Sequence, residues 1–373
     1  MDFSSRVSEG SKAETWPRYI TFGGQMETEH PDIRSMTESE LAEFMAGLGE
    51  KPFRARQLYE WLHVHLAESF EEMSNLPAAL RAKLSESAVL VTLRPVEILT
   101  SKLDGTQKYL FGLSDGNVIE SVLMRYHHGN SVCISSQVGC RMGCTFCAST
   151  IGGKVRDLRA SEMLDQVYRI QKITGERVSN VVVMGTGEPL DNYENLLRFI
   201  ALLTDEKGLH ISQRNITVST CGLTEKIRAL ADEKLQITLA LSLHASSQEK
   251  RKKLMPVANR YELGDVLDSC RYYFEKTGRR VSFEYSLVGG VNDTPEDAAE
   301  LHELIGGMNC HVNLIPVNPV RERSYVQPDR TTVLKFKNIL EKYGINVTIR
   351  REMGRDISGA CGQLRRSYMT DRD

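Results

Sequence analysis

Strand-like and helix-like segments alternate along the chain from Ser131 onward, and this alternation limits the possible folds more than any other feature. The strand candidates are short, apolar and rich in β-branched residues, as strands buried on both faces must be. Repeated βα units form a parallel sheet with right-handed crossovers, and functional residues then follow the carboxyl ends of the strands. The expected strands span residues 132–135, 181–184, 216–219, 237–243, 281–286, 312–315 and 347–349. Helical stretches lie between them, for example at 161–173, 193–203, 263–276 and 331–343.

The chain before this region divides into three parts. Residues 1–36 are polar and non-periodic, which is typical of a flexible extension. A capping box at Thr37 and Glu40 opens a helical unit, which we expect to span residues 37–88 as an accessory domain that contacts RNA. Residues 89–130 are strand-like with turns between the strands and form a β extension. We assign 131–350 to a partial (β/α) barrel and 351–373 to a C-terminal loop and tail.

Composition places the chain in an ordinary class. Its 373 residues are 41% hydrophobic and 26% charged, with a net charge of −2, which is typical of a globular protein. No apolar run approaches the roughly 20 residues of a membrane span, and the first residues lack a secretion signal. We therefore expect a cytoplasmic protein without membrane contact. From Pro319 onward the chain has 12 Lys and Arg residues but only 7 Asp and Glu residues, so this basic segment could bind phosphates or be plain solvated surface.

Three of the eight cysteines form a C-x3-C-x2-C cluster at Cys140, Cys144 and Cys147. In a long cytosolic chain, such thiols favour metal or redox chemistry over disulfides. A structural zinc ion is closed by four ligands, whereas three cysteines suit a [4Fe–4S] cluster that keeps one iron open to another ligand. The alternatives are zinc completed by a distant His or Cys, or thiols packed in a core.

This cluster, with Phe146 before its last cysteine, resembles the signature of radical S-adenosylmethionine (SAM) enzymes. The chain is similar in particular to the RlmN/Cfr family of RNA adenosine methyltransferases, from about residue 37 to residue 366, including Lys51-Pro52-Phe53-Arg54. The other segments that carry the resemblance are Cys133-Ile-Ser-Ser-Gln-Val-Gly-Cys140, Gly187-Glu188-Pro189-Leu190, Ser242-Leu243-His244, Asn313-Leu314-Ile315-Pro316-Val317-Asn318-Pro319 and Ala360-Cys361-Gly362-Gln363-Leu364.

The resemblance implies a radical SAM barrel with two cofactors, a [4Fe–4S] cluster held by the three cysteines and SAM bound at its open iron. Taken alone, a Gly-Glu-Pro turn is more often a plain loop and His244 more often a structural histidine. The positions that match SAM-binding residues of the family are Gly187, Glu188, Ser219, Ser242, Leu243, His244 and Asn318.

Two further cysteines and one carboxylate take catalytic roles by the same resemblance. Cys361 would accept a methyl group from one SAM, and the radical made from a second SAM would join that methyl carbon to an adenine ring carbon. Cys133 would then attack the Cys361 sulfur to release the RNA, and Glu120 would accept a proton. Without the match, both cysteines would be small buried residues and Glu120 an exposed strand carboxylate. The remaining cysteines, Cys221, Cys270 and Cys310, are expected in or near the core.

A disulfide between Cys133 and Cys361 requires Cα atoms about 4.4–6.8 Å apart although 228 positions separate the two residues. Glycines at 354, 359 and 362 would allow a mobile loop to bring Cys361 to the barrel mouth.

Val138 and Pro189 resemble the RlmN branch, which methylates carbon-2 of an adenosine in the peptidyl-transferase centre of 23S rRNA and, in some members, an adenosine beside the tRNA anticodon. The alternatives are Cfr-type carbon-8 methylation of 23S rRNA, which gives antibiotic resistance, a different radical SAM reaction, and a zinc-stabilised RNA-binding module without catalysis. We expect a monomer that receives electrons from a donor such as flavodoxin or ferredoxin. Candidate phosphate contacts are Arg321, Arg323, Arg350, Arg351, Arg365 and Arg366.

Overall fold

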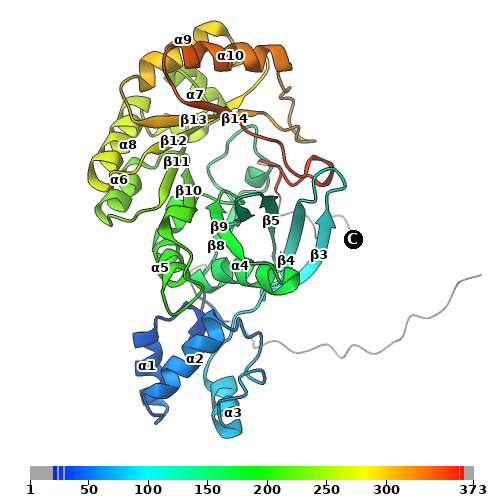
Figure 1. Cartoon of the computed structure of the whole chain (residues 1–373), viewed down its shortest axis with the longest axis vertical. Coiled ribbons are helices and arrows are strands. Elements are labelled where there is room, and N and C mark those ends of the chain that lie inside the picture. The colour runs from blue at the N-terminus through cyan, green and yellow to red at the C-terminus, as the bar shows by residue number, and fades with distance from the viewer. Residues whose placement is uncertain (1–19, 23–24, 28–29, 361, 365–373) are drawn as a thin grey trace, which may run out of the picture.

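A ten-stranded sheet organises the molecule, in the order β14-β13-β12-β11-β10-β9-β6-β5-β4-β3 (Figure 1). The computed structural model describes residues 20–22, 25–27, 30–360 and 362–364. The sheet strands are β3 Arg94–Thr100, β4 Gln107–Gly112, β5 Val118–Tyr126, β6 Gly129–Cys133, β9 Val178–Val183, β10 Ile216–Thr220, β11 Thr238–Ser242, β12 Val281–Leu287, β13 Cys310–Pro316 and β14 Val347–Ile349.

All neighbouring pairs from β6 through β9 to β14 run parallel, as the alternating sequence pattern predicts. Helices return the chain between these strands and cover the outer side of the sheet (Figure 1). Their apolar faces explain this packing, since α4 and α5 bury most of their Leu, Ile and Val side chains. These helices are α4 Ala160–Thr174, α5 Tyr193–Thr204, α6 Thr224–Asp232, α7 Gln248–Leu254, α8 Leu263–Thr277, α9 Pro295–Ile305 and α10 Arg330–Lys342.

The β extension adds three antiparallel strands to β6, because β5 pairs with β6, β4 with β5 and β3 with β4. Strands β3 and β14 are the two edges of the sheet and do not pair with each other in the part of the chain described, so the barrel is partial, as expected. A separate two-stranded sheet joins β7 Gln137–Gly139 to β8 Lys154–Asp157 on either side of the cysteine cluster. The short strands β1 Ile20–Phe22 and β2 Gln25–Glu27 form a further antiparallel pair.

The N-terminal unit is helical, with α1 Glu38–Gly47, α2 Phe53–His63 and α3 Ala78–Ser87. The predicted capping box is present, because Thr37 N–H donates to Glu40 Oε2 at 2.7 Å and Glu40 N–H donates to Thr37 Oγ1 at 3.3 Å. Figure 1 shows the three helices below the barrel. No helix in the described residues is long and apolar enough to cross a membrane.

The expectation that residues up to 36 form a flexible extension is wrong for the segment around Ile33 and Arg34, both of which are fully buried. Arg34 pairs with Asp165 on α4 and also donates to the Ala67 carbonyl. A buried charge requires such partners. Because these partners lie far away in the sequence, the local pattern of polar residues around Arg34 resembles that of an exposed segment. Most of residues 1–29 lie outside the described residues.

Candidate functional site

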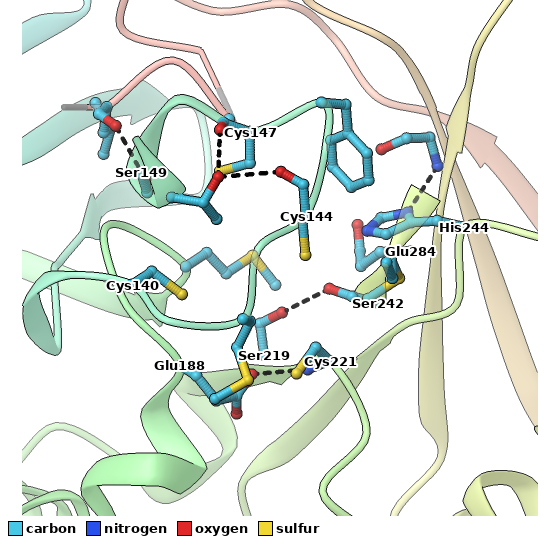
Figure 2. Close-up of a pocket in the computed structure, with 18 of the residues that line it drawn as sticks. Cys140, Cys144, Cys147, Ser149, Glu188, Ser219, Cys221, Ser242, His244 and Glu284 are labelled. Carbon is cyan, nitrogen blue, oxygen red and sulfur yellow. Dashed lines mark hydrogen bonds between the residues drawn. The ribbon is translucent and has the colours of Figure 1, made fainter. Parts of the chain in front are cut away.

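A cavity opens where the parallel strands end, and nine of the predicted cofactor residues line it. We call it the first cavity. Figure 2 shows Cys140 on one side of it and Ser242, His244 and Glu284 across from it. The nine residues are Cys140, Cys144, Cys147, Gly187, Glu188, Ser219, Ser242, His244 and Asn318. The structure therefore brings together groups that the sequence distributes over almost 180 positions.

The three cysteines lie on a loop between β7 and β8 that has specific backbone requirements. Gly139 at its start has a φ of 75°, and a Cβ there would lie 1.9 Å from the Gly153 carbonyl oxygen, so only glycine fits. Thr150 Oγ1 donates to the Cys147 carbonyl at 2.9 Å and to the Cys144 carbonyl at 3.1 Å. Thr145 N–H donates to the Leu254 carbonyl at 2.9 Å, which ties the loop to the end of α7. These bonds hold the loop against the cavity.

The chemistry of the cysteines fits a metal cluster. Burial raises the pKa of Cys140 to about 12 and raises the pKa of Cys144 well above its usual value. Buried thiols of this kind stay protonated unless a metal binds them, because a coordinating thiol is deprotonated outright. Three cysteines at one wall of a cavity suit a [4Fe–4S] cluster that keeps one iron open, whereas a structural zinc ion is closed by four ligands.

Glu188 lies deep in the first cavity, and its carboxylate is held in place by backbone. Its Oε2 accepts from Cys221 N–H at 2.8 Å and its Oε1 accepts from Leu190 N–H at 3.1 Å. Burial nevertheless raises the pKa of Glu188 above its usual value, against the lowering effect of these bonds. Gly187 has a φ of 115°, and a Cβ there would meet Ser136 Oγ at 2.7 Å, so the chain can pass here only as glycine. Glu188 is therefore a fixed acceptor that gains from a cationic partner.

Ser219, Ser242 and His244 lie at or just after the ends of the adjacent strands β10 and β11. Ser219 Oγ on β10 lies 3.3 Å from Ser242 Oγ on β11. His244 Nδ1 accepts from Ser286 N–H at 2.9 Å, which requires an unprotonated nitrogen. Burial, helped by the charge of Arg251, lowers the pKa of His244 to about 3. The imidazole is therefore a neutral part of the cavity wall. It packs edge-on against the Phe146 ring, with 5.0 Å between the two ring centroids.

Leu243 is the one predicted cofactor residue that does not line the cavity. Its side chain is fully buried in the hydrophobic core. Ser242 is the last residue of β11, and in the loop that follows Leu243 packs into the core while His244, with a φ of 56°, lines the cavity. Only its backbone lies near the site, where its N–H donates to the Glu284 carbonyl at 3.0 Å.

A second cavity adjoins the first, and Val122, Cys133, Arg351, Met353 and Ala360 are among the residues that line it. Cys361 lies outside the described residues, but its neighbours contact both spaces, since Ala360 lines the second cavity and Gly362 the first. The structure therefore places Cys133 beside the chain segment that carries Cys361. The two cavities share Met184, Ile315, Asn318, Arg350 and Leu364.

Glu120 lies on β5, and the alternative of an exposed strand carboxylate is wrong. The residue is only 6% exposed, and its Oε1 lies 3.3 Å from Lys108 Nζ. Val122 and Met124, two and four positions further along β5, line the second cavity. Because strand side chains alternate, Glu120 shares their face of the sheet.

Three chemically active residues of the first cavity were not expected there from the sequence. Cys221, expected in or near the core, lines the cavity directly after β10, and the rule on strand ends could have indicated it. Glu284 and Arg350 also line it, with Glu284 Oε2 3.8 Å from Arg350 Nη1 and 2.8 Å from the donating Asn313 Nδ2. Burial raises the pKa of Glu284. The sequence marked Arg350 only as a candidate phosphate contact and gave no signal for Glu284 or for their pairing, which joins β12 to the residue that follows β14.

The candidate phosphate contacts divide into different groups. Arg321 and Arg351 are exposed. Arg323 instead braces the cysteine loop, since its Nη2 donates to Thr150 Oγ1 at 3.1 Å. Arg350 lies in the wall between the cavities. Arg365 and Arg366 lie outside the described residues.

Comparisons with known proteins agree with this geometry. Residues 32–90 match the model of the ribosomal RNA large subunit methyltransferase N-terminal domain, and residues 134–305 match the radical SAM superfamily. The chain is 69% identical to a "Probable dual-specificity RNA methyltransferase RlmN" of Lachnospira eligens, over 92% of this chain and 98% of that protein.

A protein of the same name in Clostridium perfringens is 54% identical, over 91% of this chain and 97% of the relative. Among solved structures, a radical SAM methyltransferase from Sphaerobacter thermophilus superposes with a TM-score of 0.87 at 43% identity, covering 90% of this chain and 99% of that one. The likeness extends over the accessory unit, the barrel and the cysteine loop together.

Proposed function

Because this chain belongs to the RlmN family of radical SAM RNA methyltransferases, we propose that it methylates carbon-2 of an adenosine in the peptidyl-transferase centre of 23S rRNA, and also an adenosine next to the tRNA anticodon. The relatives carry the words "dual-specificity" in their names, which supports two kinds of RNA substrate. The observation that carries the proposal is the pair of adjoining cavities, one with three thiols and one with Cys133 beside the segment of Cys361.

Cys140, Cys144 and Cys147 would hold a [4Fe–4S] cluster at the wall of the first cavity. When bound, the cluster supplies the electron that splits SAM into methionine and a 5′-deoxyadenosyl radical. A small electron-transfer protein such as flavodoxin or ferredoxin would deliver that electron.

The first cavity provides groups that suit SAM, which carries a sulfonium, an ammonium and a carboxylate. The fixed Glu188 carboxylate would accept from the ammonium group, since a hydrogen bond to a charged partner is stronger than a neutral one. Ser219 and Ser242 would donate or accept at the ribose and the carboxylate, and Asn318 lies where both cavities meet. The neutral His244 adds a surface without charge, so it does not repel the sulfonium.

Two cysteines are needed because an adenine ring carbon has neither a lone pair nor an acidic proton for ordinary methyl transfer. In our proposal the Cys361 thiolate first takes a methyl group from one SAM as a nucleophile. The radical from a second SAM removes one hydrogen from that methyl group, whose carbon then bonds to the ring carbon. Glu120 would accept the proton that leaves the ring carbon, and the unpaired electron of the adduct would return to the bound cluster. The Cys133 thiolate would attack the Cys361 sulfur, so that a disulfide forms while the carbon–sulfur bond breaks. The released methylene carbon would keep the bonding electron pair and take up one proton from water, which completes the methyl group of the product.

Nucleoside mass spectrometry tests the proposal. Enzyme reconstituted with iron and sulfide without oxygen is incubated with SAM, a reductant and either protein-free 23S rRNA or tRNA. We expect 2-methyladenosine in both RNAs and none with the Cys361→Ala variant. Formation of 8-methyladenosine would instead show a Cfr-type enzyme, and product in rRNA alone would remove the tRNA half of the proposal. No methyladenosine in either RNA would overturn the proposal.

A further inference from the structure

Lys108 is a buried lysine close to the proposed site, and the reaction described above assigns it no role. It lies on β4 and is only 7% exposed. In the strand register Lys108 is opposite Val122, and Glu120 is opposite Leu110. Residues opposite each other in a sheet project to the same face, so Lys108 shares the face of Val122, which lines the second cavity. The diagonal from Lys108 to Glu120 is short enough for a long side chain to reach across.

The Lys108 ammonium group has two partners. Its Nζ lies 3.3 Å from Glu120 Oε1. It also donates to the carbonyl oxygen of Ser358 at 3.4 Å. Ser358 precedes Cys361 by three positions, so one side chain connects the proposed proton acceptor to the segment that carries the proposed methyl acceptor.

The segment that contains Ser358 is fixed to the turn between β3 and β4. Asp356 Oδ1 accepts from Ser101 Oγ at 2.6 Å, and Asp356 Oδ2 accepts from Lys102 N–H at 2.9 Å. Gly354 N–H donates to Asp104 Oδ2 at 3.0 Å. Figure 1 shows this C-terminal segment, in red, next to the turn between β3 and β4, in cyan. These hydrogen bonds of Asp356 and Gly354 therefore keep the Ser358 carbonyl within reach of Lys108.

Stability alone is a weak explanation for this pair. Taking a lysine and a glutamate out of water costs several kcal/mol per ion, and apolar residues of similar size are often at least as stabilising. A buried ion pair next to a cavity is better explained by chemistry that requires it. The Lys108 ammonium group, 3.3 Å from Glu120 Oε1, restricts the directions in which that carboxylate can point.

We propose that Lys108 is a positioning residue for the methylation reaction. It holds Glu120 as an oriented carboxylate, and through the Ser358 carbonyl it sets the distance between Glu120 and the Cys361 segment. When Glu120 takes up a proton, the ammonium keeps the Ser358 carbonyl as its partner. This inference rests on the proposed function, because it needs a covalent RNA adduct from which a proton must leave.

The experiment compares Lys108→Gln, which keeps hydrogen-bonding capacity without charge, with Lys108→Arg, which keeps the charge. Lys335→Met, an exposed lysine on α10, is the matched control. Two steps are measured separately: methylation of Cys361 in the protein by mass spectrometry, and the decay of the covalent protein–RNA adduct on denaturing gels after rapid mixing. Circular dichroism and iron content verify that each variant is folded and loaded.

For Lys108→Gln we expect Cys361 methylation within about 2-fold of the unaltered enzyme and adduct decay slowed by about 10-fold or more, the lower range for the loss of a general base. Lys108→Arg should recover most of the rate, and Lys335→Met should match the unaltered enzyme. A defect confined to adduct decay is not what a merely structural role would produce.

Adduct decay at the unaltered rate in Lys108→Gln would overturn the inference. If that variant does not fold, Asp356→Ala takes its place, because it releases the Ser358 segment at the surface without leaving a buried charge alone. Unchanged adduct decay in Asp356→Ala would then count equally against the inference. If even the unaltered enzyme forms neither methylated Cys361 nor an adduct, it is the proposed function that fails.

Discussion

The two adjoining cavities are made from the chain in opposite ways. The first is formed by successive strand ends and by a cysteine loop whose three thiols fall within eight residues. The second is formed by β5, β6 and the segment after β14, which meet although more than 200 positions separate them. The comparison teaches that a cysteine loop can be encoded within a few residues, whereas the second cavity exists only because distant segments meet in the fold.

The cavities also differ in electrostatics. The first contains Glu188 and Glu284, whose pKa values burial raises, and Arg350 lies 3.8 Å from Glu284 Oε2 in the wall that both cavities share. The second adds Arg351 to Arg350, with Glu352 as the acidic residue beside them. The buried carboxylates thus line the first cavity and a second guanidinium group lines only the second, which supports the proposal of a cationic small molecule in the first and a phosphate-bearing substrate at the second.

The largest effect is expected at the cysteine loop of the first cavity. Cys144→Ala should lose the brown colour and the iron of the reconstituted protein, about four irons per chain, together with all methylation, because each cluster cysteine serves its own iron. Iron analysis and nucleoside mass spectrometry measure both. Cys310→Ala, a half-buried cysteine outside both cavities, is the control and should retain iron. A fully active Cys144→Ala enzyme would refute the cluster site.

Removing the thiol of the second cavity should have a different result. Cys133→Ala should keep its iron and methylate Cys361, but stop after one turnover with the protein bound covalently to RNA, since no thiol attacks the Cys361 sulfur. Denaturing gels and mass spectrometry of the crosslinked peptide detect this species. The double variant Cys133→Ala/Cys361→Ala should not crosslink. Absence of any crosslink in the single variant would remove the resolving role from Cys133.

A smaller effect should appear in SAM affinity. Glu188→Gln removes one charge from the first cavity and should weaken SAM binding by about 10–100-fold, the equivalent of the 1.5–3 kcal/mol of a charge-assisted hydrogen bond. Equilibrium binding of SAM to the reconstituted protein measures it, with the exposed Glu194→Gln as the control. RNA affinity should not change, because the second cavity is intact. Equal SAM affinity in both variants would contradict the assignment of Glu188.

The smallest effect is in the pH dependence of stability. His244 has a folded pKa of about 3, below the unfolded value of about 6.5, so only the unfolded chain binds a proton in between. The free energy of unfolding is therefore unaffected by this histidine above pH 6.5, and it falls by about 1.4 kcal/mol per pH unit below that value. Between pH 6.5 and 5.5 the unaltered protein should thus lose about 1 kcal/mol more unfolding free energy than His244→Gln. Urea unfolding measures this, and identical slopes would show that His244 is not buried as neutral imidazole.

Much of this molecule follows from local sequence. The strands, the helices and the capping box at Thr37 were predictable because side-chain period and helix capping are encoded within a few residues. The strand-end rule also led to the cavity that contains Cys140, Glu188 and Ser242. The cysteine spacing and the segments that resemble the RlmN/Cfr family indicated the family, and the relatives confirm it.

Other features were decided only by the tertiary structure. The burial of Arg34 against Asp165, the facing away of Leu243, and the Lys108–Glu120 pair each depend on strand register or on packing between distant segments. The sequence does not show which residues will become partners. The free energy of a buried charge is set by the groups that surround it in space, and these come from distant parts of the chain. Local patterns therefore determined the elements and the cofactor loop, and the fold alone decided which side chains meet in the second cavity.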